Sequence, residues 1–230
     1  MSGICIITAR GGSKRIPKKN IKVFCGKPII AYSIEAALKS ELFDEVMVST
    51  DSEEIADVAK KYGALVPFMR SAENSDDFSG TEDVVVEVLA DYKKQGKKFS
   101  WFCCIYPTAP FMTPDRLQEA FEIFDNNREA EAVLPVVRFS FPPQRGFYNH
   151  NGYMEFKWPE FKDERSQDLE PIYHDAGQFY FVRTNAFMQQ RTVIPKRSMP
   201  LVLDDSEVQD IDNPSDWKMA ELKYKILHNR

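Results

Sequence analysis

The sequence predicts an α/β fold of the Rossmann-like kind, in which a mainly parallel sheet carries helices on both faces, with an aromatic-rich insertion. Short apolar runs typical of buried strands alternate with segments of helical period. The first of these runs leads directly into a glycine-rich turn. Strands that alternate with helices form right-handed βαβ units, which build a parallel sheet covered on both sides.

The expected strands are short, mostly apolar runs bounded by turn residues. They span residues 4–8, 46–49, 65–68, 102–106, 132–137 and 177–182. The expected helices begin near residues 28, 52, 84, 113 and 213. Pro28 and Pro114 suit a first helical turn, where the missing N–H of proline leaves no hydrogen bond unmade. Gly63 and Gly96 are typical helix stops.

Size and charge exclude several classes of protein. The chain has 230 residues, which suits one large domain or two small ones. Its 30 basic and 35 acidic residues give a net charge of −5, so we expect no nucleic-acid partner, although a small basic pocket for one nucleotide is compatible with it. No apolar run approaches the roughly 20 residues of a membrane-spanning helix, and no signal peptide is evident. We expect a cytoplasmic protein with no membrane partner.

Residues 138–171 interrupt the alternation of strands and helices. This segment is rich in aromatic residues and prolines, lacks a helical period and is too long for an ordinary loop. We therefore expect residues 1–137 and 172–230 to form the α/β domain, with 138–171 as an insertion. A dimerisation arm is the favoured interpretation, because interfaces are rich in aromatic residues, and a flap packed on its own domain is the alternative.

The strongest functional signal is the basic turn that follows the first expected strand. It places five cationic side chains within ten residues, and its glycines allow backbone N–H groups to face phosphate oxygens. Ligands bind beyond the carboxyl ends of parallel strands, which favours phosphate binding over a merely solvated loop. The spacing matches neither a P-loop nor a dinucleotide fingerprint. The residues concerned are Ala9, Arg10, Gly11, Gly12, Ser13, Lys14, Arg15, Lys19 and Asn20.

A second signal lies near the C-terminus, where Asp210 and Asp212 flank Ile211. On a strand, these two carboxylates point to the same face and repel each other unless a cation lies between them. Mg²⁺ prefers oxygen ligands and bridges to phosphates, so the pair is a candidate magnesium site. A plain pair of surface carboxylates is the alternative interpretation.

Two weaker signals complete the set. Arg70, Ser79 and Thr81 lie in a polar stretch before a helix, and the same stretch fits a helix capping box. His174 and Asp175 precede the last expected strand. A His–Asp pair suits proton transfer, but no nucleophile motif accompanies it, so substrate binding or a structural hydrogen bond is an equal alternative.

Taken together, the motifs resemble the CMP-acylneuraminate synthetase family. The resemblance spans nearly the whole chain, including the insertion, and is closest to its bacterial pseudaminic acid branch. Tyr106 stands where sialic acid enzymes usually carry Gln, and the run from Tyr173 to Tyr180 is similar to that branch. The matching motifs, in order, are residues 9–20, 49–51, 106–110 and 210–212.

The resemblance implies an enzyme that joins CTP to a nine-carbon 2-keto acid sugar, giving a CMP-sugar and pyrophosphate, with Mg²⁺ as cofactor and a homodimer as assembly. It implies that the triphosphate is held by Arg10, Ser13, Lys14 and Lys19. It implies that cytosine and ribose are bound by Asn20, Arg70, Ser79 and Thr81. The metal ligands would be Asp210 and Asp212. The sugar pocket would contain Tyr106, His174, Asp175 and Gln178.

Two alternatives stay open at this point. One is the same reaction on N-acetylneuraminic, legionaminic or an octulosonic acid. The other is a non-catalytic nucleotide-binding protein, which has no need of a metal to activate an attacking hydroxyl.

Overall fold

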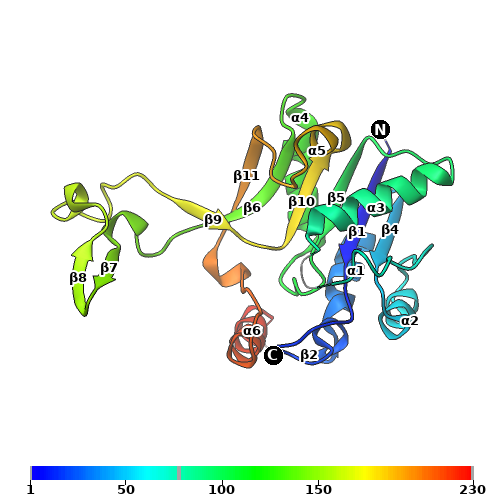
Figure 1. Ribbon diagram of the computed structural model, residues 1–230, viewed down its shortest axis with the longest axis horizontal. Coiled ribbons are helices and arrows are strands. Elements are labelled where there is room, and N and C mark those ends of the chain that lie inside the picture. The colour runs from blue at the N-terminus through cyan, green and yellow to red at the C-terminus, as the bar shows by residue number, and fades with distance from the viewer. Residues whose placement is uncertain (1, 77–78, 229–230) are drawn as a thin grey trace.

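A computed structural model describes residues 2–76 and 79–228 (Figure 1). Its main feature is a seven-stranded sheet of order β11-β6-β10-β5-β1-β4, with β9 paired to β6. Five of these strands run in one direction and two, β9 and β10, run against them. The strands are β1 (Gly3–Thr8), β4 (Glu45–Ser49), β5 (Trp101–Ile105), β6 (Ala132–Arg138), β9 (Tyr173–Asp175), β10 (Phe179–Arg183) and β11 (Ser198–Leu203).

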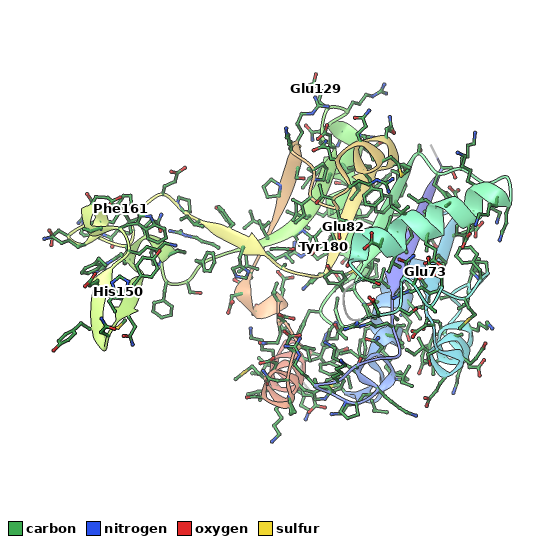
Figure 2. All side chains as sticks on the ribbon, viewed as in Figure 1. Glu73, Glu82, Glu129, His150, Phe161 and Tyr180 are labelled. Carbon is green, nitrogen blue, oxygen red and sulfur yellow. The ribbon has the colours of Figure 1, made fainter. Side chains whose placement is uncertain are left out.

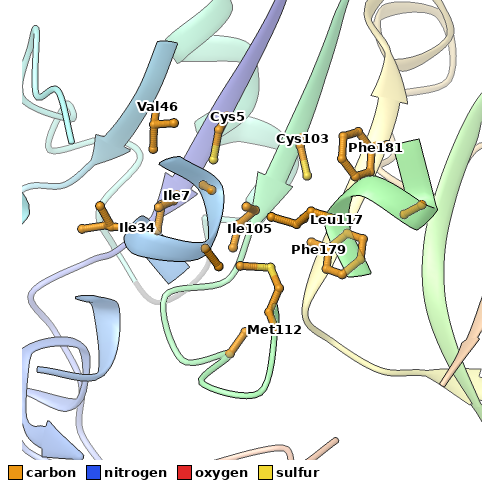
Figure 3. Close-up of a cluster of buried hydrophobic side chains, with 14 of the residues drawn as sticks. Cys5, Ile7, Ile34, Val46, Cys103, Ile105, Met112, Leu117, Phe179 and Phe181 are labelled. Carbon is orange, nitrogen blue, oxygen red and sulfur yellow. The ribbon is translucent and has the colours of Figure 1, made fainter. Parts of the chain in front are cut away.

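Helices cover both faces of this sheet, which confirms the expected fold class. Alternate residues of a strand point to opposite faces, so β1 feeds two separate clusters. Cys5 and Ile7 contact the side chains of α1, α2 and α4, as Figure 3 shows for part of the cluster. Ile4 and Ile6 lie against α3 and α5. The helices are α1 (Ile29–Lys39), α2 (Glu53–Lys61), α3 (Thr81–Lys94), α4 (Pro114–Asn126), α5 (Thr184–Gln190) and α6 (Pro214–Leu227). Among these described helices, none has the length and apolar content to cross a bilayer.

A third, aromatic cluster joins the C-terminal helix to the N-terminal part of the chain. Phe24, in the small hairpin of β2 (Val23–Phe24) and β3 (Lys27–Pro28), is fully buried. Its ring meets Tyr32, Trp217 and Tyr224 edge-on, with centroids 5.5–5.7 Å apart. Ile16 and Ile211 belong to the same cluster. Residues near both ends of the chain are thereby packed together.

Residues between β6 and β9 extend away from the sheet as an arm (Figure 1). The hairpin of the arm is formed by β7 (Phe147–His150) and β8 (Tyr153–Phe156), flanked by the short 3₁₀ helices η2 (Pro143–Arg145) and η3 (Pro159–Phe161). His150 and Phe161, labelled in Figure 2, lie in this arm, far from the labelled residues of the sheet.

The structure differs from expectation around residues 65–68, which form no strand. Leu65 makes a single bridge to Met47, and its neighbours then leave the sheet edge. Pro67 explains this, because proline cannot donate a ladder hydrogen bond. β9, β11 and α5 were not expected from the sequence.

The aromatic cluster generates a stability prediction. Phe24→Ala is expected to lower the free energy of unfolding by about 3–5 kcal/mol, because it leaves a cavity among three aromatic rings. Val23→Ala is the matched control, since Val23 is 62% exposed one residue away and an exposed truncation changes stability by less than about 0.5 kcal/mol. Urea unfolding measures both, and equal midpoints would contradict the role of the cluster.

Candidate active site

A cavity of about 480 Å³ opens at the carboxyl ends of β1 and β5. Because ligands bind beyond the carboxyl ends of parallel strands, the loops after β1, β4 and β5 are expected to meet at one crevice. Two of these three loops, those after β1 and β5, line the cavity. The third loop, after β4, lies behind the lining, where Ser49 binds Arg70 and Asp51 accepts a hydrogen bond from the Gly11 N–H at 2.7 Å. The lining residues are Thr8, Arg10, Ser13, Lys14, Arg15, Ile16, Lys19, Asn20, Arg70, Ser79, Gly80, Thr81, Val84, Tyr106, Pro107, Thr108 and Asp212.

The basic turn meets the acidic segment at this cavity. Lys19, on the 3₁₀ helix η1 (Lys19–Ile21), donates to the Ile211 carbonyl at 2.7 Å and lies 3.8 Å from Asp212. Arg15 donates two parallel hydrogen bonds, both 2.9 Å long, to the two carboxylate oxygens of Asp212. These hydrogen bonds join residues that are 192 and 197 positions apart in the sequence.

Burial lowers the pKa of the Lys19 ammonium, and the neighbouring Arg15 and Arg10 lower it further. The carboxylates of Asp212 and Asp210 act in the opposite direction and stabilise the charged form. A polyanion in the cavity would add to this second effect, since an opposite charge within a few ångströms favours the cation. The site therefore gains most electrostatically from a ligand of high negative charge.

Two buried residues shape the turn. Asn20 is 5% exposed, and its amide donates to the Arg10 carbonyl at 2.9 Å, which holds the turn closed on itself. Arg70 is 8% exposed and donates to the Ser49 hydroxyl and carbonyl at 3.0 and 2.6 Å. Burial lowers the pKa of Arg70, while Asp51 and Glu87 oppose that effect. Ala9, Gly11 and Gly12, which follow β1, are not among the residues that line the cavity.

A capping box is present at the start of α3, but it lies one residue later than Ser79–Glu82. The cap of α3 is Gly80, whose N–H donates to Asp83. The single proton of the Ser79 hydroxyl instead faces two acceptors, the Asp76 carboxylate at 2.6 Å and the Glu73 carbonyl at 2.9 Å. Thr81 opens the helix, and its hydroxyl lies 3.5 Å from that of Tyr106. Both Ser79 and Thr81 line the cavity, together with the neighbouring loop after β5.

Of the four residues expected in a sugar pocket, Tyr106 alone lines this cavity. Gln178 is 4% exposed, and its amide donates to the Glu207 carbonyl at 2.8 Å. His174, on β9, has its Nδ1 2.9 Å from the Asp175 carbonyl oxygen and its ring against Phe139. The side chain of Asp175 accepts hydrogen bonds from its own turn and from β10.

The expectation that Asp210 and Asp212 share one face of a strand is wrong. They lie in an irregular segment between the 3₁₀ helix η4 (Asp205–Glu207) and α6, because the chain must turn there to bury Ile211 and cap the helix. Asp212 reaches the cavity, whereas Asp210 is exposed and contributes through its charge near Lys19.

Side chains outside the cavity hold this segment in place. Arg116, on α4, donates to both carboxylate oxygens of Glu207 at 3.0 and 2.9 Å. Lys223, on α6, donates to the carbonyls of Asp205 and Val208. Sequence analysis gave no role to Arg116, Glu207 or Lys223, because their partners lie on other elements and no local motif marks them.

A metal ion at this cavity would need a bound phosphorylated ligand to complete its coordination. Among the residues that the structure describes, no group of three or more His, Cys, Asp or Glu side chains is arranged to hold an ion. Asp210 and Asp212 provide oxygen donors only, which suits Mg²⁺, an ion that keeps several waters and takes other ligands from phosphates. The residues therefore fit Mg²⁺ if it arrives with a phosphorylated ligand and Arg15 releases Asp212.

The sequence is similar to those of known cytidylyltransferases. The family model described as cytidylyltransferase matches residues 4–209. A pseudaminic acid cytidylyltransferase of Campylobacter jejuni is 44% identical over 99% of this chain and 98% of its own length. A CMP-N,N'-diacetyllegionaminic acid synthase of Legionella pneumophila is 35% identical over 95% of this chain and 94% of its own.

The fold is also similar to that of a solved sugar-activating synthetase. A solved CMP:2-keto-3-deoxy-manno-octonic acid synthetase complexed with CTP superposes with a TM-score of 0.69 over 100% of both chains, at 16% identity. That likeness concerns the fold, whereas the family match and the full-length relatives concern the sequence. On these grounds the chain belongs to the cytidylyltransferase family.

Proposed function

We propose that this protein transfers the CMP group of CTP to the anomeric hydroxyl of pseudaminic acid, releasing pyrophosphate. The observation that carries the proposal is the meeting of a basic turn with Asp212 at a cavity beyond the parallel strands. The nature of the sugar rests on the full-length similarity to two pseudaminic acid cytidylyltransferases, at 44% and 43% identity. We place the reaction in the cytoplasm, in agreement with three buried, unpaired cysteines.

The cavity offers separate groups for the parts of CTP. We assign the triphosphate to the cations of the basic turn, and the cytosine and ribose to other residues of the cavity lining, which include the start of α3. The triphosphate residues are Arg10, Ser13, Lys14 and Lys19, with the backbone of Ala9, Gly11 and Gly12. The nucleoside residues are Asn20, Arg70, Ser79 and Thr81. Tyr106 is assigned to the sugar.

Catalysis would rest on position and charge. Cations fixed around the α-phosphate and the departing pyrophosphate stabilise charge that develops as the sugar hydroxyl attacks in line. When bound, Mg²⁺ would be held by Asp210 and Asp212 and would neutralise phosphate charge. Arg15 now occupies the carboxylate of Asp212 and is 68% exposed, so it is free to move to a phosphate. Guanidinium binds carboxylate and phosphate with the same two-pronged geometry.

We also propose that residues 138–171 form a dimerisation arm beside a catalytic domain of residues 1–137 and 172–230. A two-stranded hairpin has no hydrophobic core of its own. Exposed apolar side chains that gather on such a hairpin and its flanks mark an interaction surface. A second copy of the chain is the proposed partner. The exposed fractions are 89% for Phe141, 51% for Phe147, 47% for Tyr148, 78% for Tyr153 and 62% for Met154.

The direct test is pyrophosphate release from each of four nucleoside triphosphates with a panel of acid sugars. Release with CTP and pseudaminic acid, well above that with other nucleotides, is expected. Preference for N-acetylneuraminic, legionaminic or an octulosonic acid would replace the sugar, and no release with any pair would refute the enzyme.

Asp212→Asn is expected to lower turnover on the order of 10²-fold or more, because it removes the carboxylate that faces the basic turn. The matched control is Asp205→Asn, in the same acidic segment, where the side chain is 69% exposed and lies outside the cavity lining. Pyrophosphate release measures both variants. Near-normal turnover of Asp212→Asn would remove the metal assignment.

Lys19→Ala is expected to lower turnover on the order of 10²-fold, as the loss of one charge-stabilising group does. Lys18→Ala is its control, because Lys18 is adjacent, 67% exposed, and paired with Glu54 rather than turned to the cavity. Steady-state kinetics at saturating sugar distinguish the two. If the two variants behaved alike, the basic turn would be a solvated loop.

Deleting residues 141–161 is expected to give a monomer, since it removes the exposed hairpin. Light scattering gives the mass in solution. The control is Ile226→Ser, which removes an apolar side chain that is 67% exposed on α6 and should leave the dimer intact. A deletion variant that keeps the dimer mass would show that the arm is a flap.

A further inference from the structure

One polar side chain of the cavity takes no part in the hydrogen bonds described above. Thr8 ends β1, whose other residues are glycine or apolar and are all buried. It lines the cavity and is itself partly exposed. Within residues 2–76 and 79–228, the Thr8 hydroxyl makes no hydrogen bond. A polar group that lines a cavity without a partner in its own chain is a candidate contact for a ligand.

The sheet fixes the direction of the Thr8 side chain. Successive residues of a strand point to opposite faces, and Ile4 and Ile6 pack on the face that α3 and α5 cover. Thr8 therefore points to that same face, which α3 crosses in Figure 1. Thr81 and Val84, in the first turn of α3, also line the cavity. Thr8 and the start of α3 thus border the same space.

The polar neighbours of Thr8 on the two adjacent strands already have contacts. Ser49, opposite Thr8 in the pairing of β1 with β4, accepts a hydrogen bond from Arg70 at 3.0 Å. On the other side, Tyr106 follows the last residue pair of β1 with β5, and its hydroxyl lies 3.5 Å from that of Thr81. Of the three side chains in this layer, Thr8 alone has no partner in the part of the chain that the structure describes.

We propose that the Thr8 hydroxyl makes a hydrogen bond to the nucleoside half of CTP, which adds Thr8 to the nucleotide site. This inference rests on the proposed function, because it concerns a substrate of that reaction. Thr81, Val84 and Tyr106 are uncharged, whereas four of the five cations of the lining belong to the basic turn. The fifth cation, Arg70, is itself assigned to the nucleoside. Base and ribose are the uncharged part of CTP, so they suit the place beside Thr8.

The chemistry of a hydroxyl sets the size of the expected effect. A hydroxyl both donates and accepts, so it pairs equally well with a ribose hydroxyl or with a polar edge of the base. The loss of one neutral hydrogen bond changes an equilibrium constant roughly twofold to tenfold. The nucleoside stays bound while the α-phosphate reacts, so this contact stabilises substrate and transition state alike. Its loss therefore raises the KM for CTP and leaves kcat unchanged.

The first test replaces the hydroxyl alone. Thr8→Val keeps the branched shape of the side chain, and the KM for CTP is expected to rise roughly twofold to tenfold. The kcat at saturation and the KM for the acid sugar should stay unchanged. Thr8→Ser retains the hydroxyl and is expected to restore most of the affinity for CTP. Calorimetric titration with CTP, without the acid sugar, gives a readout besides activity and should show the same ratio.

Altered nucleotides identify the group that Thr8 contacts. CTP is compared with analogues that lack in turn the 2′-hydroxyl, the 3′-hydroxyl, the exocyclic amino group, the ring nitrogen or the carbonyl oxygen of the base. One of these analogues is expected to bind the wild type more weakly than CTP does, but to bind Thr8→Val as well as CTP does, because the partner of the missing group is already gone. Equal losses in both proteins for every analogue would overturn the inference.

Thr184→Val is the matched control. Thr184 begins α5 and lies outside the cavity lining, and its hydroxyl likewise has no hydrogen-bond partner among the described residues. The variant therefore reproduces the effect on stability of replacing an unpaired threonine hydroxyl, but not the effect on CTP. Thermal unfolding of both valine variants, measured alongside the kinetics, compares their stabilities.

The outcomes separate this inference from the proposed function. If no nucleoside triphosphate releases pyrophosphate with any acid sugar, and CTP does not bind, both fall. If the wild type is active with CTP but Thr8→Val has the same KM for CTP as Thr184→Val, the inference alone falls. It also falls if the KM for the sugar rises in place of the KM for CTP, since Thr8 then contacts the sugar.

Discussion

The contact of Lys19 with the carbonyl of Ile211 is the constraint on which the site depends. It joins residues 192 positions apart, and it holds because Ile16 and Ile211 are both buried in the aromatic cluster under α6. The hydrogen bond by itself is worth only about 0.5–3 kcal/mol. Burial of Phe24 and Trp217 among their neighbours contributes more, since each is a large aromatic side chain removed from water. Packing therefore brings the two charged segments together, and their charges then define what they bind.

A second contact, the ion pair of Arg15 with Asp212, stabilises the crowded basic turn. Burial is the main cause of the lowered pKa of Lys19, and repulsion by Arg15 and Arg10 lowers it further. Asp212 offsets that repulsion by occupying both prongs of the Arg15 guanidinium. A phosphate group offers Arg15 the same two-pronged geometry with more charge, so under the proposed function the triphosphate would compete with Asp212. Binding of the triphosphate would free the Asp212 carboxylate from Arg15, and Asp212 could then hold a metal ion that arrives with the triphosphate.

The sequence predicted the parts of this structure that local pattern determines. β1, β4 and β5 are short, mostly apolar runs, which the sequence shows directly. α2 has apolar residues at helical spacing and Ser52 as its N-cap, which mark it as a helix. β9 and β11 could not be found in that way, because pairing with β6, distant in sequence, makes them strands. The basic turn was evident from its charges and its place after β1. The structural role of Gln178 was not evident from the sequence, because its hydrogen-bond partner is the Glu207 carbonyl on η4, which no sequence pattern marks.

The positions of Asp175 and Tyr180 are set by the sheet rather than by the arm. β9 pairs with β6 in a register that places Asp175 opposite Val136, and the Ala176 N–H donates to the Pro135 carbonyl at 3.0 Å. Both contacts lie at the root of the arm, outside the β7–β8 hairpin. Removing the hairpin leaves that register, and hence the position of Asp175 and Tyr180, intact. A change in activity on removal of the hairpin would therefore come from a lost partner subunit rather than from a displaced β9.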